Sequence, residues 1–471
     1  MRMKIRPLQF RTVTAAVLLF FAACASVATA SSRGVASLTD HITKAGQPFS
    51  LAFMPDAEKV TLHVIWSNDY VHTSAKPVVS ALGIELMLMS SGGAGPRDAR
   101  QIKQDMVALG SGASLLATPD HVYGTFSSIP QTLDETVSIV RHVIASPSFD
   151  QLRFDVAKEA KQKRVETQLE QRSSILWRGA RKALLGESTL TDYWNNTPIT
   201  PVISSLSLAD VERWHKETFT RQNVTVTVAG SIAAHVAADA IDRLLQDLPA
   251  NRTDAPVVNL AQGLRKGVTV LLHDEAAPTT LIAAIGMLPA SREGGELVDV
   301  IAVSALGKGK DSRLLKASVG ELAETDRVDA SIANFSRAIR VFGINASIDN
   351  KTAADAYFLF EETYNEFLKG NLVEDEVLRA AVPFANSLQS SANNPDLLAY
   401  GLGQLLLDEL PKELLRTVTQ DSVALKADDI NQRIVTKYPL WDDMIKVILS
   451  SDADVIEADC VIKRIEEIRD C

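Results

Sequence analysis

Cysteine and histidine are scarce in this sequence, and both lack the spacings that their chemistry requires. The 471 residues include three cysteines, and none is in a Cys-x-x-Cys pair. None of the eight histidines has another histidine three or four positions away, so no helix presents two imidazoles to one metal ion. Gly-x-Ser-x-Gly is absent, and residues 307–312 lack the spacing of a phosphate loop. These absences exclude the usual signatures of redox, serine and phosphate-binding enzymes.

Positive charge is also in deficit. The chain has 48 Lys and Arg residues against 58 Asp and Glu residues, which gives a formal net charge of −10. Four of the positive charges fall in the first 11 positions, so removal of a leader would shift the charge to −14. Neutralising nucleic-acid phosphates requires a Lys/Arg surface, and no long basic run occurs. We therefore expect no nucleic-acid partner, and neutral or basic peptides are better-matched ligands.

The first 30 residues have the pattern of a secretory signal peptide. A basic start is followed by an apolar stretch at 12–25, which is too short to span a membrane comfortably, and by the small-x-small triplet Ala28-Thr29-Ala30. We expect cleavage before Ser31, a periplasmic or secreted protein, and no transmembrane helix in the mature chain. An alternative is a lipid anchor at Cys24, because residues 21–24 loosely resemble a bacterial lipoprotein cleavage box.

Cleavage would leave two cysteines, Cys460 and Cys471, in an oxidising compartment. In one straight helix these residues would lie roughly 16 Å apart, beyond disulfide reach. We favour a terminal disulfide that requires the tail to fold back. Other pairing, or two free thiols, is the alternative.

Strand and helix patterns occur in the same order twice. With 46% hydrophobic and 23% charged residues, the chain is long enough for two or more globular domains. The first half predicts strands at 60–66, 121–127 and 224–230, and helices at 97–109, 131–144, 151–185 and 207–218. The second half predicts strands at 268–273, 279–287, 338–344 and 444–450, and helices at 297–306, 353–369 and 374–388.

A duplicated α+β chain explains this order. Val122-Tyr123-Gly124 and Val341-Phe342-Gly343 lie 219 residues apart, and each is followed by an amphipathic helix. We therefore predict two homologous α+β domains, each a mostly antiparallel sheet packed with helices. The predicted boundaries are 1–30 for the signal peptide, 31–249 for the first domain, 250–267 for a linker, and 268–471 for the second domain.

One helix, at 81–89, has the outline of a lost metal motif. Zinc peptidases of the inverted type need His-x-x-Glu-His, because residues three and four apart share a helix face and Glu activates the metal-bound water. Glu85 occupies the Glu position here, and Leu82 and Leu86 occupy the two His positions. By itself the pattern indicates only a buried Leu/Met-rich helix.

In its context the chain resembles the insulinase-like, pitrilysin-type zinc peptidase family, in the short form with two domains. The resemblance covers nearly all of the mature chain. It rests on the opening helix with its Ser-Gly-Gly exit, Pro147-Ser148-Phe149 before a long helix, the strand at 224–230, and Ser312-Arg313-Leu314 after a Gly-rich turn. It implies two domains that face each other like a clam shell, with a bound peptide added to a sheet as a strand.

The resemblance also implies that the catalytic residues are missing. The family's third zinc ligand, a Glu, aligns with Gln168, although Glu166 and Glu170 lie nearby. The Arg and Tyr of the second domain, seven residues apart, align with Gly320 and Arg327, or with Val319 and Asp326 one residue earlier. We therefore expect no bound zinc or other cofactor, and a closed apolar pocket beside Glu85. The charged run at 158–164 is typical of a solvated helix face.

These features lead to the hypothesis of a non-catalytic insulinase-like subunit. It would bind peptide, or complete the chamber of a zinc-containing homologue, in the periplasm. The alternative is a stand-alone peptide-binding or scaffold protein that has no enzyme partner, either alone or as a homodimer. The least favoured alternative is a residual metallopeptidase with an unrecognised site.

Overall fold

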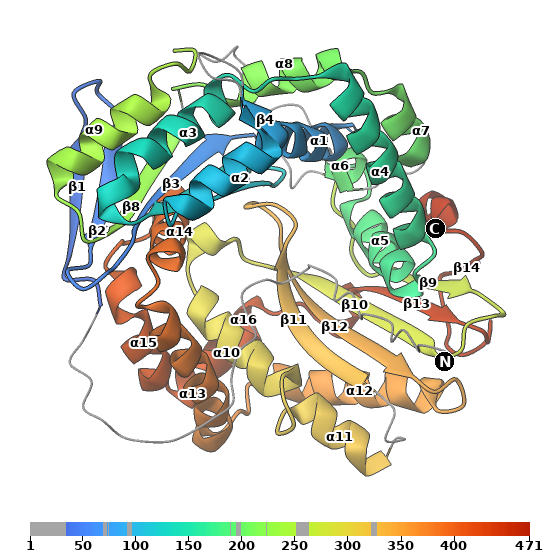
Figure 1. Ribbon diagram of the computed structural model, residues 1–471. Coiled ribbons are helices and arrows are strands. Elements are labelled where there is room, and N and C mark those ends of the chain that lie inside the picture. Colours follow the sequence, from blue (N-terminus) through green and yellow to red (C-terminus); the bar gives the residue numbers. More distant parts are fainter. Residues whose placement is uncertain are drawn as a thin grey trace, which may run out of the picture. The chain divides into compact units, whose positions relative to one another are not determined.

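The structure is a computed structural model that describes residues 34–68, 73, 75–91, 97–188, 190–194, 199–222, 224–250, 263–321 and 327–471. The predicted signal peptide, the alternative lipid anchor at Cys24 and most of the predicted linker lie outside these residues. Gly34–Cys471 forms one structural unit (Figure 1). In the described part of the chain, no helix is both long and apolar enough to cross a membrane.

The first half of the chain builds a mixed sheet with the strand order β1-β2-β8-β3-β7-β6. Residues alternate along its central strand β3, so that Val60, Leu62, Val64 and Trp66 share one face of the sheet and pack into an apolar core. The strands are β1 (Ser37–Ile42), β2 (Pro48–Phe53), β3 (Val60–Ser67), β6 (Gly112–Ala117), β7 (His121–Ser128) and β8 (Val224–Gly230).

Amphipathic helices cover that apolar face. The buried residues of four helices, α1, α3, α8 and α9, join the same core as the strands. The helices of this half are α1 (Lys76–Met89), α2 (Ala99–Ala108), α3 (Leu133–Ala145), α4 (Gln151–Leu169), α5 (Arg172–Leu185), α6 (Leu190–Trp194), α7 (Ile199–Ser205), α8 (Leu208–Thr218) and α9 (Ala234–Leu245). Two short strands, β4 (Ser90–Ser91) and β5 (Arg97–Asp98), pair with each other between α1 and α2.

The second half builds a corresponding sheet with the order β11-β12-β10-β13-β9-β14. Its central strands β12, β10 and β13 pair antiparallel to one another, as β7, β3 and β8 do in the first sheet. Gly124 and Gly343 take equivalent places, each opposite the central strand of its sheet. The strands are β9 (Thr269–His273), β10 (Thr280–Leu288), β11 (Arg327–Asn334), β12 (Arg340–Ile348), β13 (Ile445–Ser450) and β14 (Cys460–Ile462).

Helices of the second half follow the same sequence of elements. Helix α10 follows β10 as α1 follows β3, and α12 follows β12 as α3 follows β7. The two-domain α+β class predicted from the sequence is confirmed. The helices are α10 (Glu296–Gly307), α11 (Arg313–Glu321), α12 (Ala353–Leu368), α13 (Glu374–Ser391), α14 (Pro395–Leu407), α15 (Leu414–Ala424) and α16 (Ala427–Lys437).

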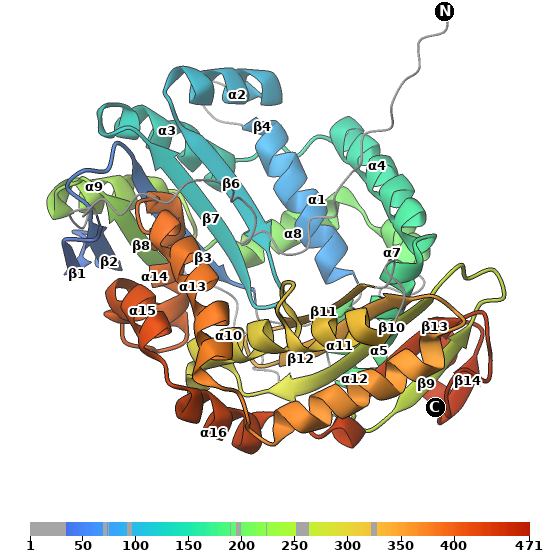
Figure 2. The same cartoon turned by 90° about the horizontal axis from the view of Figure 1, so that it is seen from below.

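The two halves exchange helices across their sheets. Helix α5 of the first half packs on β10 and β13 of the second sheet, and helix α14 of the second half packs on β3 and β8 of the first (Figure 2). Hydrogen bonds fix α14, because the hydroxyls of Thr61 and Thr227 donate to Asp396 and to the Ala399 carbonyl, respectively. Each sheet is therefore covered on its second face by a helix from the other half.

The prediction of one long helix over 151–185 is wrong. Helix α4 ends at Leu169, Gln171 has extended backbone angles, and α5 begins at Arg172. Because α4 packs on α1 and α7 while α5 packs on the second sheet, one straight helix cannot satisfy both contacts. Tertiary packing breaks the helix here without proline or glycine at the junction.

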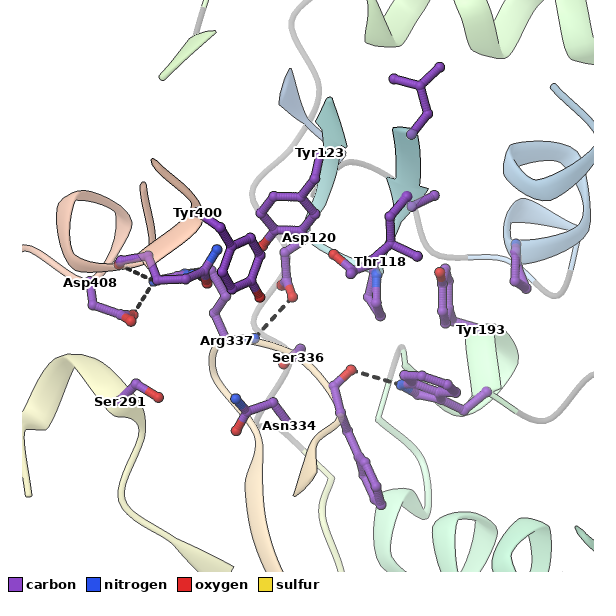
Figure 3. A pocket seen from close by; sticks show the side chains of 18 of the residues that line it. Thr118, Asp120, Tyr123, Tyr193, Ser291, Asn334, Ser336, Arg337, Tyr400 and Asp408 are labelled. Carbon is purple, nitrogen blue, oxygen red and sulfur yellow. Dashed lines mark hydrogen bonds and ion pairs between the residues drawn. The ribbon is translucent and has the colours of Figure 1, made fainter. Parts of the chain in front are cut away.

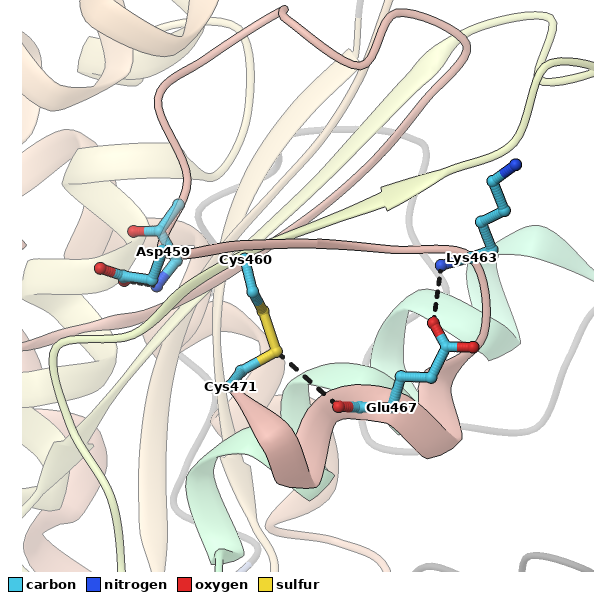
Figure 4. Close-up of a disulfide and its surroundings, with 6 residues drawn as sticks. Asp459, Cys460, Lys463, Glu467 and Cys471 are labelled. Atoms are coloured by element: carbon cyan, nitrogen blue, oxygen red, sulfur yellow. Dashed lines mark hydrogen bonds between the residues drawn. A yellow bond between two sulfur atoms is a disulfide. The ribbon is translucent and has the colours of Figure 1, made fainter.

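The end of the chain folds back on itself. Strand β14 runs parallel to β9, and a 3₁₀ helix, Ile465–Asp470, returns the chain toward it. Cys460 and Cys471 form a disulfide with their Cα atoms 5.7 Å apart (Figure 4). Ile465 and Ile468 are buried in the core beneath α5, so the disulfide closes a segment that packs on the second sheet.

Candidate functional site

Helix α1 carries the degenerate metal motif, and its two leucines belong to the core. Leu82 is 0% exposed and Leu86 is 1% exposed, and both pack within the apolar cluster of the first half. Neither side chain has a lone pair to offer a metal ion, so these positions do not fit zinc. Both leucines are therefore core residues, and the closed apolar pocket expected beside Glu85 stays a prediction.

A close contact holds α1 in place. Gly83 lies against the ring of Trp214 on α8, so tightly that a Cβ atom at Gly83 would overlap the indole. Trp214 itself is 4% exposed. The glycine between the two leucines therefore serves helix packing.

Glu85 faces a cation from α4. The pKa of Lys161 is lowered, mainly because the side chain is partly buried and also because Arg164 repels its charge. Glu85 raises this pKa, because its carboxylate stabilises the charged ammonium. Lys161 is half-buried, so this part of the charged run at 158–164 is not the solvated face that the sequence predicts.

The remaining expected metal positions do not converge on Glu85. Gln168 is exposed near the end of α4, and Glu166 is exposed and accepts a hydrogen bond from Gln162 at 3.2 Å. Among the residues that the structure describes, no group of three or more His, Cys, Asp or Glu side chains could hold a metal ion.

Of the expected Arg/Tyr positions, Arg327 does not line the cavity formed by Tyr123, Arg337 and Tyr400. Gly320 belongs to α11, and Arg327 begins β11 with an exposed side chain. In the alternative register Val319 belongs to α11, and Asp326 lies outside the described residues.

A candidate site is a cavity of about 720 Å³ lined by residues of both halves. One wall comes from α1 and the edge strand β6, and the opposite wall comes from α14 and the turn between β11 and β12 (Figure 3). The residues that line these walls include Ala81, Leu116, Tyr123, Arg337, Tyr400 and Gln404.

Arg337 organises the polar side of the cavity. Its guanidinium forms an ion pair with Asp408 and donates to Oε1 of Gln404 at 3.0 Å. Its backbone N–H donates to Oδ2 of Asp120 at 2.9 Å, a bond that joins the β11–β12 turn to the β6–β7 turn (Figure 3). Burial raises the pKa of Asp408 and Arg337 opposes this rise. The charged groups of this wall are therefore engaged with one another.

Aromatic rings form the apolar side. The rings of Tyr123 and Tyr400 lie 5.9 Å apart. Burial raises the pKa of Tyr400 to about 12, and it also raises the pKa of Tyr123, so both hydroxyls are neutral at physiological pH. On the adjoining wall, the Trp194 indole donates to the Phe335 carbonyl at 3.0 Å.

His63 lies behind the two tyrosines, beneath α14. Its ring stacks on Tyr123 at 5.9 Å, and its Nδ1 is hydrogen-bonded to the Thr125 hydroxyl at 2.8 Å. The side chain is 0% exposed, and burial lowers its pKa to about 4. A neutral imidazole thus supports the aromatic wall of the cavity.

Sequence reasoning missed the cavity residues because no local motif joins them. Tyr123, Arg337 and Tyr400 come from a strand, a turn and a helix far apart in the chain. One signal was available for Tyr123, since it belongs to the repeated Val-Tyr-Gly and Val-Phe-Gly segments.

Comparisons with known proteins agree with this architecture. A family model described as "Peptidase M16 inactive domain" matches residues 205–381. A crystal structure of a peptidase M16 inactive domain from Pseudomonas fluorescens is 16% identical with a TM-score of 0.76, and covers 88% of this chain and 98% of its own. A protease from Helicobacter pylori is 14% identical with a TM-score of 0.73, and covers 88% and 99%.

A longer structure also matches. The periplasmic protease PqqL from Escherichia coli is 11% identical with a TM-score of 0.73, over 95% of this chain and 49% of its own. No curated protein sequence matches the chain.

The fold and the site define a two-domain α+β protein with a degenerate metal helix. The family model over residues 205–381 and the shared fold support the resemblance of the chain to insulinase-like (M16, pitrilysin-type) peptidases and to their inactive-domain proteins. The resemblance predicted from the sequence is confirmed.

Proposed function

We propose that the chain is a non-catalytic insulinase-like protein that binds peptide and completes the chamber of a zinc-bearing partner subunit in the periplasm. The observation that carries the proposal is the pair Leu82 and Leu86, which replaces both imidazole ligands with buried hydrocarbon. A Glu without imidazoles does not hold zinc tightly at neutral pH. Hydrolysis would therefore depend on the partner's metal.

The edge strand β6 supports peptide binding. Among the described residues it pairs with β7 on one side only, so its other side offers backbone groups that have no strand partner there. Leu115, Leu116 and Ala117 of this strand line the cavity, and an extended peptide added there would run along its wall. Main-chain hydrogen bonds would then supply affinity with little dependence on sequence.

One comparison and one sequence feature support a partner and a location. This chain matches about half of the length of PqqL, which is described as a periplasmic protease. A second subunit of the same fold would bring the assembly to a similar size. The apolar stretch near the N-terminus is consistent with export.

Peptide binding is tested by fluorescence anisotropy with a labelled, unstructured peptide of about ten residues. We expect saturable binding without cleavage. Along an edge strand successive N–H groups point alternately toward and away from the neighbouring strand. Of the variants Ser114→Pro and Leu115→Pro, one should therefore unfold β6 while the other keeps the fold and loses peptide. Unchanged peptide binding in the variant that keeps the fold would contradict the β6 site.

The partner is tested by co-purification with an exported homologue that has an intact His-x-x-Glu-His, followed by native mass spectrometry. A stable heteromeric complex whose peptidase activity exceeds that of the homologue alone is the expected result. Peptide binding in a chain that forms no such complex would favour the stand-alone peptide-binding or scaffold function. The exposed, partly unpaired β6 edge is the observation that makes this second function reasonable.

A further inference from the structure

We propose that His63 makes the contact between the two halves sensitive to acid: protonation of its imidazole releases helix α14 from the first sheet. Tyr400 and Gln404 of α14 line the cavity, so release would also remove one of its walls. The inference concerns a conformational change within this chain, and it does not depend on peptide binding. It rests on the place of His63, on the atoms around its ring, and on the small contact that α14 must break.

His63 lies where the two halves meet. It belongs to β3, the central strand of the first sheet, and α14 of the second half packs on this strand. The ring of His63 meets the ring of Tyr400 edge-on, with centroids 5.4 Å apart. A Cβ atom added at Gly403 would lie 3.2 Å from Cδ2 and 3.6 Å from Nε2 of the imidazole. The helix therefore has no space above the ring for a water molecule at Gly403.

The atoms around the ring suit the neutral imidazole. Nδ1 is hydrogen-bonded to the Thr125 hydroxyl at 2.8 Å, whereas Nε2 is buried and has no hydrogen-bond partner among the described residues. One ring nitrogen carries a proton in the neutral form, and both do in the imidazolium. Protonation would therefore make Nε2 a buried, charged donor without an acceptor, which is costly until water reaches it.

No charged side chain compensates the imidazolium from the neighbouring strands or from the middle of α14. The titratable groups that face His63 are Tyr123 on β7 and Tyr400 on α14, and His121 lies beyond Tyr123 with ring centroids 5.8 Å apart. Strand β8 places Thr227 opposite His63. Burial is the cause that lowers the pKa of His63 to about 4, with no carboxylate acting against it.

The carboxylates of α14 lie at its two ends and have other partners. Asp396 accepts from the Thr61 hydroxyl at 2.5 Å, and Asp408 pairs with Arg337. Burial raises the pKa of Asp408 and Arg337 opposes this rise, so acid also weakens that pair. Because Asp408 and Arg337 both belong to the second half, loss of their pair does not by itself free α14 from the first sheet.

The contact that α14 must break is small and partly polar. Thr61, His63 and Thr227 are fully buried beneath the helix, and water can hydrate all three once the helix leaves. The apolar part is a cluster separate from the main cores of both halves, and it consists of Ala52, Met54, Ala229, Leu398, Ala399 and Leu402. Release of α14 therefore exposes little apolar surface and can occur while the main cores stay folded.

The coupling to pH has a definite size. His63 has a pKa of about 4 beneath α14, whereas a histidine exposed by release titrates near 6.5, so release takes up a proton. Between pH 7 and pH 5 the equilibrium constant for release should therefore rise about twentyfold.

The test is hydrogen–deuterium exchange of the full chain at pH 7 and pH 5, read by mass spectrometry and corrected for the intrinsic pH dependence of amide exchange. We expect the protection of α14 amides to fall about twentyfold. Helix α5, which covers the second sheet in the same way, is the internal control, and its protection should change little.

Two variants assign the effect to one imidazole. His63→Gln should keep the protection of α14 the same at both pH values, while the matched His235→Gln, at an exposed position on α9, should retain the fall. Melting temperatures at pH 7 verify that both variants are folded. If His63→Gln does not fold, exchange at the ring C2 carbon of wild-type histidines replaces it, and the pKa of His63 should lie clearly below that of His235.

The opposite outcomes overturn the proposal. Unchanged protection of α14 in the wild type, or an equal fall for α14 and α5, would show that acid does not release this helix selectively. An equal fall in wild type and folded His63→Gln would assign the release to another group. A pKa of His63 equal to that of His235 would show that the ring is not held neutral by α14.

Discussion

At the scale of single residues, buried charges make the second half of the chain sensitive to substitution. Asp299 on α10 is fully buried, accepts from Arg340 at 2.6 Å, and accepts from Nη2 of Arg433 at 2.8 Å. Arg340 is 1% exposed, so its charge has no access to water. A buried guanidinium that loses its ion-pair partner destabilises the folded protein, because its charge is then neither hydrated nor paired.

Asp299→Asn should therefore destabilise the protein by about 3–5 kcal/mol, because it leaves the Arg340 guanidinium buried with a neutral partner. The matched control Glu366→Gln breaks an exposed pair with Lys369 and should cost at most about 1 kcal/mol. Urea denaturation of both variants measures the difference. Equal costs would show that burial does not set the value of this pair.

His63 predicts a dependence of stability on pH. Its pKa is about 4 in the folded chain, whereas an unfolded histidine titrates near 6.5, so the unfolded chain takes up the proton first. The neutral imidazole therefore contributes fully to the free energy of unfolding above pH ~6.5. This contribution, up to about 3 kcal/mol, is lost as the pH falls toward 4.

Urea midpoints measured between pH 7 and pH 4.5 check this prediction. His63→Gln should keep an uncharged polar side chain beneath α14 and remove that part of the pH dependence. An identical fall in the midpoint for the variant and the wild type would assign the effect to other groups.

At the scale of elements, the first sheet shows how far a sequence pattern reaches. Alternation predicted the strands at 60–66, 121–127 and 224–230 correctly. The polar residues of that alternation suggest a face open to water, yet Thr61, His63 and Thr227 are each 0% exposed. Helix α14 covers these three side chains. Because α14 belongs to the other half of the chain, the sequence around the strands does not predict this contact.

The packing of α1 on α8 gives an element-scale prediction. Gly83→Ala should destabilise the protein by about 1–3 kcal/mol, because the new Cβ overlaps Trp214 and this cost exceeds the gain in helix propensity of about 1 kcal/mol. Gly401→Ala on α14 is the matched helical control. Its Cβ would lie 3.2 Å from the end of the flexible Leu415 side chain, so it should be neutral or stabilising by up to about 1 kcal/mol. Equal melting temperatures for the two variants would contradict the close contact.

At the scale of the whole molecule, the duplication could be predicted and the cavity could not. Strand and helix order repeats along the sequence, and the two sheets have corresponding orders. The predicted single helix was wrong at the break between α4 and α5, and the cavity residues Arg337 and Tyr400 were not predicted at all. Contacts between the halves decide both features. Leu82 and Leu86 could be aligned with a metal motif because helix spacing is a local property.

The most direct measurement of the central claim is metal analysis of the purified chain, together with a peptide-cleavage assay with and without a chelator. We expect far less than one zinc ion per chain, no chelator-sensitive turnover, and no gain of turnover on adding zinc. One tightly bound zinc per chain with chelator-sensitive cleavage would contradict it, because Leu82 and Leu86 leave Glu85 without the two imidazoles that a family zinc site requires.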